Sequence, residues 1–252
     1  MVNLGTPVYG SAVSGLKRIE GRSLTVESYQ GRKIVANTNI QPSKRQYVDI
    51  DWLPAAAESY HISADISDYV IVPVPIVTSD VPNRNLQAFP NGEITYFDPI
   101  HGTFVYNTFK GKPTHIDHRN EDPTQAKGVI FSSYYTYVPR YRTGKIITLC
   151  GFDRSKDRRL ANSIISGERD SYSMGAFVTT FVCSICHTPY SKEGPKACPH
   201  QLDPQAPTAQ VINGKLNYMN CRSVCFFETS SVGSPADISA FHSAEELLSV
   251  SL

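Results

Sequence analysis

Three segments of the chain carry side chains that together could activate a serine nucleophile. Ser173 lies in the run Ser-Tyr-Ser-Met-Gly-Ala-Phe-Val, His118 ends the run Lys-Pro-Thr-His-Ile-Asp-His, and Glu228 lies in Phe-Phe-Glu-Thr-Ser-Ser-Val. A serine hydroxyl attacks a carbonyl poorly unless a base takes its proton and a third group orients that base. A hydroxyl, an imidazole and a carboxylate, each beside a predicted strand, therefore indicate acyl transfer.

Each of these residues also has a plainer interpretation. A serine before a strand is usually a turn residue, and a lone histidine is usually solvent-exposed or structurally bonded. His115 lies three residues before His118, so on a strand the two imidazoles would point to opposite faces. Glu228 needs a partner because burying an unpaired charge is costly, and an Arg or Lys would serve equally. Gly175 would let the backbone approach a bound carbonyl closely.

A second set of donors lies between the serine and the glutamate. Cys-x-x-Cys, followed after eleven residues by Cys-x-His, has the spacing of a zinc knuckle. Either Cys183, Cys186, Cys198 and His200 bind one zinc, or Cys221 and Cys225 replace some of these ligands; free buried cysteines are the plainer alternative.

Four protein ligands leave no coordination position for water, so the predicted cofactor is a structural zinc ion. The zinc ion would join the cysteine-rich segment to the two predicted strands that flank it, one beginning near Ser173 and the other containing Glu228. We expect it thereby to fix how Glu228 approaches His118.

Composition sets wide limits on the class of protein. The chain has 252 residues, 40% of them hydrophobic and 19% charged, with a formal net charge of +1. These values suit one globular domain, or one domain with an inserted module, and they do not favour a nucleic-acid partner. No apolar run approaches the roughly 20 residues of a membrane span, and the first residues lack the pattern of a secretory signal. We expect an intracellular protein.

Hydrophobic periodicity predicts a mainly β core with a few packed helices. Pro73 and Pro75 make the first of the core strands an edge strand or an irregular one. The predicted strands are 69–78, 127–137, 145–152, 174–182 and 224–232, with a hairpin within 21–35, and the predicted helices are 98–109, 157–167 and 236–248.

Five segments between about residues 77 and 240 resemble one known family. They are Val81-Pro-Asn-Arg-Asn, Thr108-Phe-Lys-Gly-Lys-Pro-Thr-His-Ile-Asp-His, Ala126-Lys-Gly-Val-Ile, the helix that leads to Ser173-Met-Gly, and Phe227-Glu-Thr-Ser-Ser-Val-Gly-Ser-Pro-Ala. The family is that of the prohead (capsid maturation) proteases of tailed bacteriophages. These are serine proteases with the assemblin-like fold of the herpesvirus maturation proteases.

The resemblance implies an α+β fold with a barrel-like, mainly β core, packed helices and a small zinc-binding insert. Residues 66–252 would be the protease domain, with the insert at about 183–225. Residues 1–65 fall outside the resemblance. Because residues 40–68 show no strong periodicity, we expect an N-terminal extension whose order could depend on a partner. Members of the family from large phages carry a similar Cys-x-x-Cys…Cys-x-His insert after the serine strand, whereas the compact members lack it.

Carried over by position, the resemblance implies Ser173 as nucleophile, His118 as base and Glu228 as orienting acid of a serine endopeptidase. Two assignments stay open. An alignment through Asp122-Pro123 would select His115 as the base. Herpesvirus relatives use a second histidine as the third member, for which His187 and His200 are the candidates.

The same resemblance implies capsid and scaffold proteins as substrates, inside the prohead or in the host cytoplasm, and allows a homodimer. From the small net charge and the lack of a long apolar run, we expect no nucleic-acid or membrane partner. Two other functions compete with the one that the resemblance implies: a zinc-stabilised structural or interaction protein of the virion without protease activity, and a metallohydrolase that uses the Cys/His cluster. Ser243-Ala-Glu245 resembles the small-x-Glu cleavage sites of the family, although a helix N-cap at Ser243 is an alternative.

Overall fold

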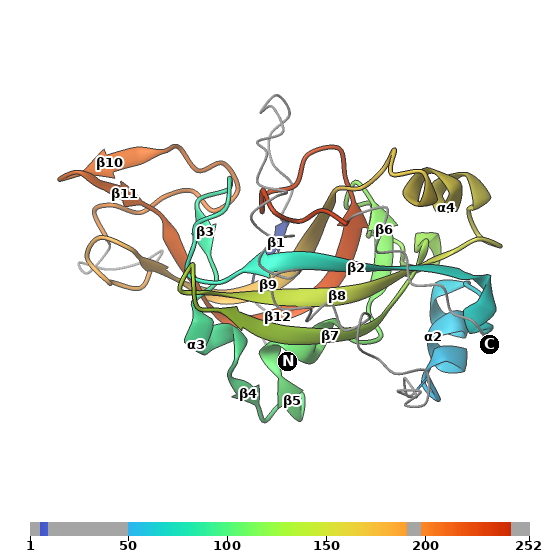
Figure 1. Cartoon of the computed structure of the whole chain (residues 1–252). Coiled ribbons are helices and arrows are strands. Elements are labelled where there is room, and N and C mark those ends of the chain that lie inside the picture. Colours follow the sequence, from blue (N-terminus) through green and yellow to red (C-terminus); the bar gives the residue numbers. More distant parts are fainter. Residues whose placement is uncertain (1–5, 10–49, 191–197, 243–252) are drawn as a thin grey trace.

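The computed structural model describes residues 6–9, 50–190 and 198–242 (Figure 1). The strands are β1 (Thr6–Tyr9), β2 (Tyr69–Thr78), β3 (Gln87–Ala88), β4 (Phe97–Asp98), β5 (Thr103–Phe104), β6 (Pro113–Ile116), β7 (Gly128–Val138), β8 (Thr143–Asp153), β9 (Tyr172–Cys183), β10 (Gln210–Ile212), β11 (Lys215–Asn217) and β12 (Met219–Ser231). The helices are α2 (Leu53–Tyr60), α3 (Asn91–Ile94) and α4 (Arg158–Ile165), with 3₁₀ turns η1 (Ile66–Asp68), η2 (Val105–Phe109) and η3 (Pro123–Gln125).

One eight-stranded sheet dominates the described part of the chain, which confirms the prediction of a sheet-rich core with few helices. Its strands follow the order β1-β9-β12-β6-β7-β8-β2, and β3 also pairs with β12. The central strand β12 runs parallel to β6 and antiparallel to β9. The β10–β11 hairpin extends at the end of the sheet that lies away from α2 and α4 (Figure 1).

Strand β2 is an edge strand, as its prolines predict. Among the described strands it pairs with β8 alone, and the register shifts between Pro75 and Val77. Proline cannot donate a backbone hydrogen bond, so it is tolerated where one side of the strand has no neighbour or where the ladder is interrupted.

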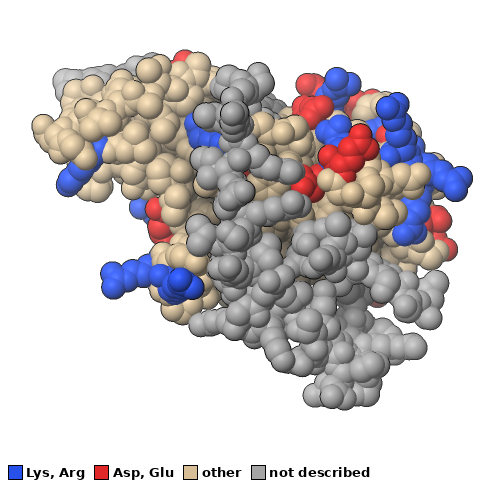
Figure 2. Space-filling model, turned by 45° about the horizontal axis from the view of Figure 1, so that its top comes forward, with Lys and Arg blue, Asp and Glu red and all other residues tan. Residues whose placement is uncertain are grey.

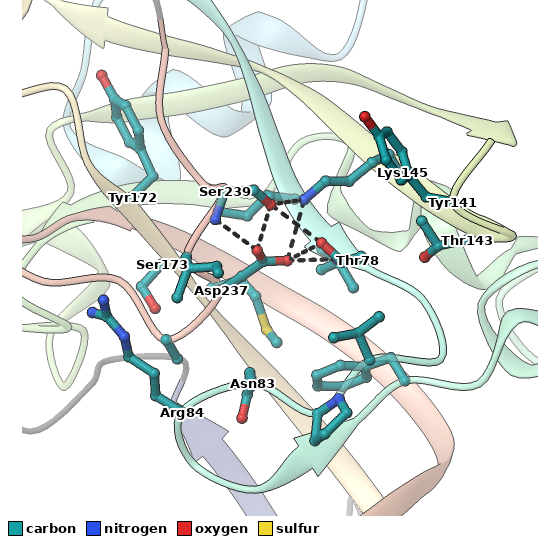
Figure 3. Close-up of a pocket in the computed structure, with 18 of the residues that line it drawn as sticks. Thr78, Asn83, Arg84, Tyr141, Thr143, Lys145, Tyr172, Ser173, Asp237 and Ser239 are labelled. Carbon is teal, nitrogen blue, oxygen red and sulfur yellow. Dashed lines mark hydrogen bonds and ion pairs between the residues drawn. The ribbon is translucent and has the colours of Figure 1, made fainter. Parts of the chain in front are cut away.

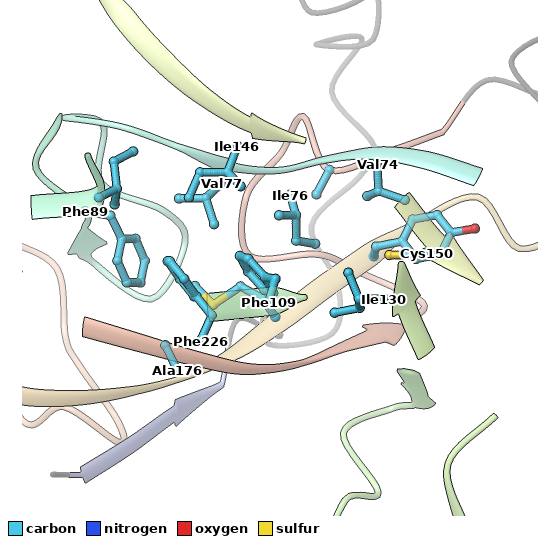
Figure 4. Packing of buried hydrophobic residues seen from close by; sticks show 14 of the residues in the cluster. Val74, Ile76, Val77, Phe89, Phe109, Ile130, Ile146, Cys150, Ala176 and Phe226 are labelled. Atoms are coloured by element: carbon cyan, nitrogen blue, oxygen red, sulfur yellow. The ribbon is translucent and has the colours of Figure 1, made fainter. Parts of the chain in front are cut away.

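The main hydrophobic core takes side chains from β2, at one end of the strand order, and from β9, next to the other end, so the sheet curls around it. Val74 and Ile76 of β2 lie on one side of Phe109, and Ala176 of β9 and Phe226 of β12 lie on the other (Figure 4). The rings of Phe109 and Phe226 are stacked, with centroids 4.3 Å apart. The 3₁₀ turn η2 therefore fills the interior of the curved sheet.

A smaller hydrophobic cluster lies against α2. Leu53 of this helix is buried with Tyr69, Val129 and Phe131. Residues 50–62 thus pack on the same sheet as the rest of the described chain. The domain boundary placed at residue 65 stays a prediction, because most of residues 1–49 lie outside the described part.

Two of the helix predictions can be compared directly with the structure. The helix over 157–167 is confirmed as α4, where Asp157 caps the first turn by accepting a hydrogen bond from Leu160 N at 3.0 Å. The prediction of a helix over 98–109 is wrong, because this segment forms the β4–β5 pair and η2. Gly102 adopts a φ of +64° there, which reverses the chain and ends any helix.

Of the predicted C-terminal helix, the described residues 236–242 are not helical, and the remainder to residue 248 lies outside the described chain. The hairpin predicted within 21–35 and the Ser243-Ala-Glu245 segment also lie outside it.

The surface mixes charges of both signs. On the face shown in Figure 2, Lys and Arg side chains lie beside Asp and Glu side chains. In the described part of the chain, no helix has the length and apolar composition required to cross a membrane.

Candidate functional site

Three adjacent strands bring the predicted catalytic segments together. In the pairing of β9 with β12, Ser173 lies opposite Ser230, and in the pairing of β12 with β6, Ser230 lies beside His115. Directly paired residues on neighbouring strands point to the same face of a sheet. Ser173, Ser230 and His115 therefore form one row across three strands, although they are far apart in the sequence.

A β-bulge in β12 places Glu228 on the same face as Ser173. The register shifts between Phe226 and Glu228, so that Phe226 lies opposite Ala176 while Glu228 lies opposite Gly175 rather than Met174. Without the extra residue, Glu228 would share the core-facing side of Phe226, because side chains alternate along a strand. The bulge turns the carboxylate out of the core.

Gly175 provides the space that Glu228 occupies. A Cβ atom added at this position would lie 2.6 Å from Phe227 Cζ and 2.9 Å from Glu228 Cγ, closer than atoms pack. The sequence-based interpretation, in which this glycine admits a bound carbonyl, gave it a different role. In the structure the glycine of the Ser-x-Gly motif makes room for the bulge and for the carboxylate.

A strained turn after β6 directs His118 back toward β12. Asp117 and His118 have φ values of 50° and 55°, in the left-handed region that non-glycine residues rarely adopt. Arg169 holds the neighbouring backbone, because it donates hydrogen bonds to Ser231 O at 3.2 Å and to Asp117 Oδ1 at 3.4 Å. Strain of this kind persists only where the surroundings enforce it.

His118 and Glu228 form a close, buried pair. His118 Nδ1 lies 2.5 Å from Glu228 Oε1, and the two side chains are 9% and 0% exposed. The hydroxyl of Ser230 donates to Glu228 Oε2 at 2.7 Å and accepts from His118 N at 3.2 Å. An ionised carboxylate only accepts hydrogen bonds, so an ionised Glu228 would select the His118 tautomer that has its proton on Nδ1 and its lone pair on Nε2.

Ser173 is buried beside this pair. It is 3% exposed, and its Oγ makes no hydrogen bond to any residue in the described part of the chain. The structure therefore places the candidate nucleophile on the same face as Glu228 without a hydrogen bond to His118. Catalytic hydrogen bonds are often long in the absence of substrate and tighten when substrate binds.

His115 lies close to the same groups but in a different environment. It is 1% exposed, and burial lowers its pKa, an effect that the nearby Glu228 charge only partly opposes. No hydrogen bond joins it to Glu228 in the described structure, whereas His118 has one. Of the two candidate bases, His118 is therefore the one whose ring contacts Glu228.

A mainly apolar cavity opens beside Ser173. Its lining includes Ile76, Val77, Phe89, Val138 and Met174. On its wall, Lys145 Nζ lies 3.3 Å from Asp237 Oδ2 and also donates to Ser239 Oγ (Figure 3).

Asp237 holds the cavity wall together, since it accepts hydrogen bonds from Thr78 N at 2.7 Å and from Ser239 N at 2.9 Å. Burial lowers the pKa of Lys145. Burial would raise the pKa of Asp237, but the Lys145 charge and the hydrogen bonds from Ser239 and Thr78 outweigh it and lower that pKa. The pair attaches the segment after β12 to β2 and β8.

The Cys/His cluster forms a second site at the opposite end of β9. One ligand atom from each of four residues lies within 4.8 Å of all the others: Cys183, Cys186, Cys198 and His200. Cys186 Sγ and Cys198 Sγ are 3.4 Å apart, and Cys183 Sγ is 3.9 Å from His200 Nδ1. Tetrahedral ligands at about 2.3 Å from zinc would be about 3.8 Å apart, so this donor set fits such an ion.

The surroundings of the cluster orient its ligands. Ile185 N donates to Cys183 Sγ at 3.3 Å, and Asn217 Nδ2 donates to His200 O at 2.7 Å. Hydrogen bonds from Thr188 and His200 lower the pKa of the exposed Cys186 thiol to about 6. Asn217 ends β11, so the cluster joins the end of β9 to the segment that enters β12.

Of the two ligand sets that the sequence left open, the structure assembles the one without Cys221 and Cys225. Cys221 is fully buried on β12, and Cys225 lies farther along that strand. His187 lies exposed in the turn after Cys183, where its backbone N donates to Cys183 O at 3.1 Å. Neither His187 nor His200 contacts His118 among the described interactions, and Glu228 does.

Sequence reasoning missed Ser230, Arg169 and Lys145. Ser230 had a usable signal, because it lies two residues after Glu228 and therefore on the same face of the strand. Arg169 and Lys145 had none, since their partners lie far away along the chain.

Comparison of the chain with models of known protein families, with curated proteins and with solved structures finds no match.

Proposed function

We propose that this chain is a serine endopeptidase of the prohead-protease type, with Ser173 as nucleophile, His118 as base and Glu228 as orienting acid. The proposal also includes an assemblin-like fold, with scaffold proteins and capsid proteins as the substrates. These two parts of the proposal come from the sequence resemblance alone. The observation that carries the catalytic assignment is the 2.5 Å contact between His118 Nδ1 and the fully buried Glu228, on the sheet face that also presents Ser173.

The pair is suited to general-base catalysis. Glu228 fixes the tautomer and the orientation of His118, and it stabilises the imidazolium that forms when His118 accepts a proton. Ser173 Oγ would transfer its proton to His118 Nε2 and attack the scissile carbonyl, and water would then release the acyl-enzyme. The apolar cavity beside Ser173 is the place where a substrate side chain next to the scissile bond would bind.

Within this proposal the Cys/His cluster binds a structural zinc ion. Three thiolates and one imidazole complete a tetrahedral coordination shell and leave no position for a reacting water. Bound zinc would join the β10–β11 segment to the ends of β9 and β12. A shell closed by four protein ligands argues against a metallohydrolase, which requires an open coordination position for water or substrate.

Labelling with a fluorophosphonate tests the nucleophile without knowledge of the natural substrate. The wild-type protein should form an adduct at Ser173, and Ser173→Ala should form none. Ser171→Ala is the matched control, because Ser171 is also buried, two residues earlier, and donates to Asp170 rather than to the site. Absence of an adduct at Ser173 in folded, zinc-loaded protein would contradict the proposal.

A peptide covering residues 238–252 of this chain gives a second readout, because it contains the Ser-Ala-Glu sequence. Cleavage after Glu245 by the wild type and not by Ser173→Ala is the expected result. Cleavage that survives in Ser173→Ala, but is lost on chelation and restored by metal, would indicate the metallohydrolase instead.

The second candidate function is a zinc-stabilised structural protein of the virion without protease activity. The observation that favours it is Ser173 Oγ, which is buried and has no hydrogen bond to His118 in the described structure. This alternative predicts no fluorophosphonate adduct in the wild type and a large loss of thermal stability on chelation.

A further inference from the structure

A second group of reactive side chains lies outside the Ser173 site. Cys225 on β12 has its Sγ 3.7 Å from His101 Nε2, and His101 Nδ1 lies 2.5 Å from Asp98 Oδ2. A thiol, an imidazole and a carboxylate thus follow one another in the order required to activate a nucleophile. Nothing in the proposed protease mechanism uses any of the three.

The carboxylate determines which nitrogen of His101 is basic. Asp98 also accepts a hydrogen bond from Ile100 N at 2.8 Å, which fixes its orientation in the turn. Burial opposes ionisation of Asp98, but the hydrogen bonds from His101 and Ile100 outweigh it and lower its pKa. An ionised Asp98 accepts the Nδ1 proton of His101, so the lone pair on Nε2 faces Cys225.

Cys225 needs such a base in order to react. Burial raises the pKa of its thiol, and the positive charge of Lys112 only partly opposes that effect. The thiol therefore keeps its proton at neutral pH unless a neighbouring group takes it. The thiolate is the reactive form, so Cys225 reacts only if such a group is present. His101 Nε2 is placed to accept this proton.

Position distinguishes Cys225 from the other five cysteines. Cys150 and Cys221 are fully buried, and burial raises the thiol pKa of Cys150 to about 12. Cys183, Cys186 and Cys198 belong to the metal-ligand cluster. Cys225 is only partly buried, and the side chain of its partner His101 is 43% exposed, so a reagent in solution can reach the pair.

We propose that Cys225 is a modification site: a nucleophilic thiol, activated by His101, that exchanges with small anionic disulfides such as glutathione disulfide. His101 accepts the Cys225 proton, and the thiolate attacks one sulfur of the reagent. A bond forms between Cys225 Sγ and that sulfur while the disulfide bond of the reagent breaks. The released thiolate takes up the proton from His101, so the reagent is the oxidant. Lys112 attracts its negative charge.

The test uses the full chain loaded with zinc, which masks the thiols of the cluster, and glutathione disulfide as the probe. Adduct formation is followed by intact mass and located by peptide mapping. The wild type should gain one adduct at Cys225, and Cys225→Ser should gain none. His101→Ala should slow the reaction at least about tenfold, since a general base contributes about 10²–10⁴-fold. Asp98→Asn should slow it less.

His61→Asn is the matched control. His61 is an exposed histidine in another turn, and asparagine tolerates its left-handed backbone conformation. Circular dichroism of each variant confirms that it is folded. Equal rates at Cys225 in the wild type and His101→Ala would overturn the proposal, as would preferential modification of another cysteine in the zinc-loaded protein. Because no step involves Ser173, these outcomes are independent of the fluorophosphonate experiment.

Discussion

The Cys/His cluster and the Ser173 site are built over very different lengths of chain. Cys183 and His200 are 17 residues apart, and all four donors of the cluster come from this short stretch of chain. His118 and Glu228 are 110 residues apart and meet only because β6 and β12 are neighbours in the sheet. The first site depends on local spacing and the second on strand register, so the two should respond to substitution in different ways.

The largest expected effect is on activity and belongs to the Ser173 site. Glu228→Gln keeps the volume of the side chain but presents an amide to His118, which disturbs the tautomer that the carboxylate selects. We expect the rate of peptide cleavage to fall about 10³–10⁴-fold, as for the loss of an orienting acid in a triad.

Glu121→Gln, at an exposed position, is the control for this substitution. Both variants should keep a thermal midpoint close to that of the wild type. An unchanged cleavage rate in folded Glu228→Gln would remove Glu228 from the site.

Metal removal should act mainly on stability. Bound metal at a thousandfold excess over its Kd stabilises a folded protein by about 4 kcal/mol, provided that it does not bind the unfolded chain. Chelation, or Cys198→Ser, should lower the thermal midpoint measured by calorimetry, and zinc should restore it only in the wild type. If the metal-bound insert also positions Glu228, the rate of peptide cleavage should fall together with the thermal midpoint. If chelation changes neither, the metal neither stabilises the fold nor positions Glu228.

The ion pair in the wall of the cavity beside Ser173 offers a third test. Lys145→Met leaves Asp237 without its cationic partner, and breaking one half of a buried pair costs about 3–5 kcal/mol. The free energy of unfolding, measured with urea, should fall by this amount. The double variant with Asp237→Leu should recover part of the loss. Failure of the double variant to recover any stability would indicate that packing, rather than the charge, is what Lys145 supplies.

Gly175→Ala should disturb the Ser173 site by adding a single methyl group to β9. The added Cβ would lie within 3 Å of both Phe227 and Glu228, so the bulge must shift. Overpacking of this kind costs about 1–3 kcal/mol, and we expect a lower cleavage rate as well, with the zinc affinity unchanged. Ala176→Gly, one residue along the same strand, controls for a general effect on β9. A fully active Gly175→Ala variant would show that Glu228 does not need this space.

The smallest expected effect belongs to neither site. Burial would raise the pKa of Asp157, but the hydrogen bond from Leu160 N and the Lys127 charge outweigh it and lower that pKa. A group with a lowered folded pKa contributes stability above its unfolded pKa of about 3.9 and loses it as pH falls through the folded value. Asp157→Asn should therefore flatten the acid limb of the stability curve between about pH 5 and pH 3, measured by thermal unfolding. An identical acid limb would rule out this contribution.

The sequence by itself determined the local features. It was sufficient for the edge character of β2, for the position of α4, and for a Cys/His cluster between β9 and β12, because each depends on residues close together in the chain. It left open whether Cys221 and Cys225 belong to that cluster, which the structure assembles without them. It failed over 98–109, where a weak helical periodicity competed with the turn formed at Gly102. Short-range propensity is overridden where a turn and tertiary packing favour another structure.

Only the tertiary structure decided how the Ser173 site is assembled. The bulge that turns Glu228 out of the core, the left-handed turn that directs His118, and the space above Gly175 all arise where β9, β12 and β6 meet. A shift of one residue in register moves every side chain of a strand to the opposite face. Residue types could therefore suggest Ser173, His118 and Glu228, but strand pairing places Ser173 and Glu228 on one face of the sheet, and the turn after β6 brings His118 to them.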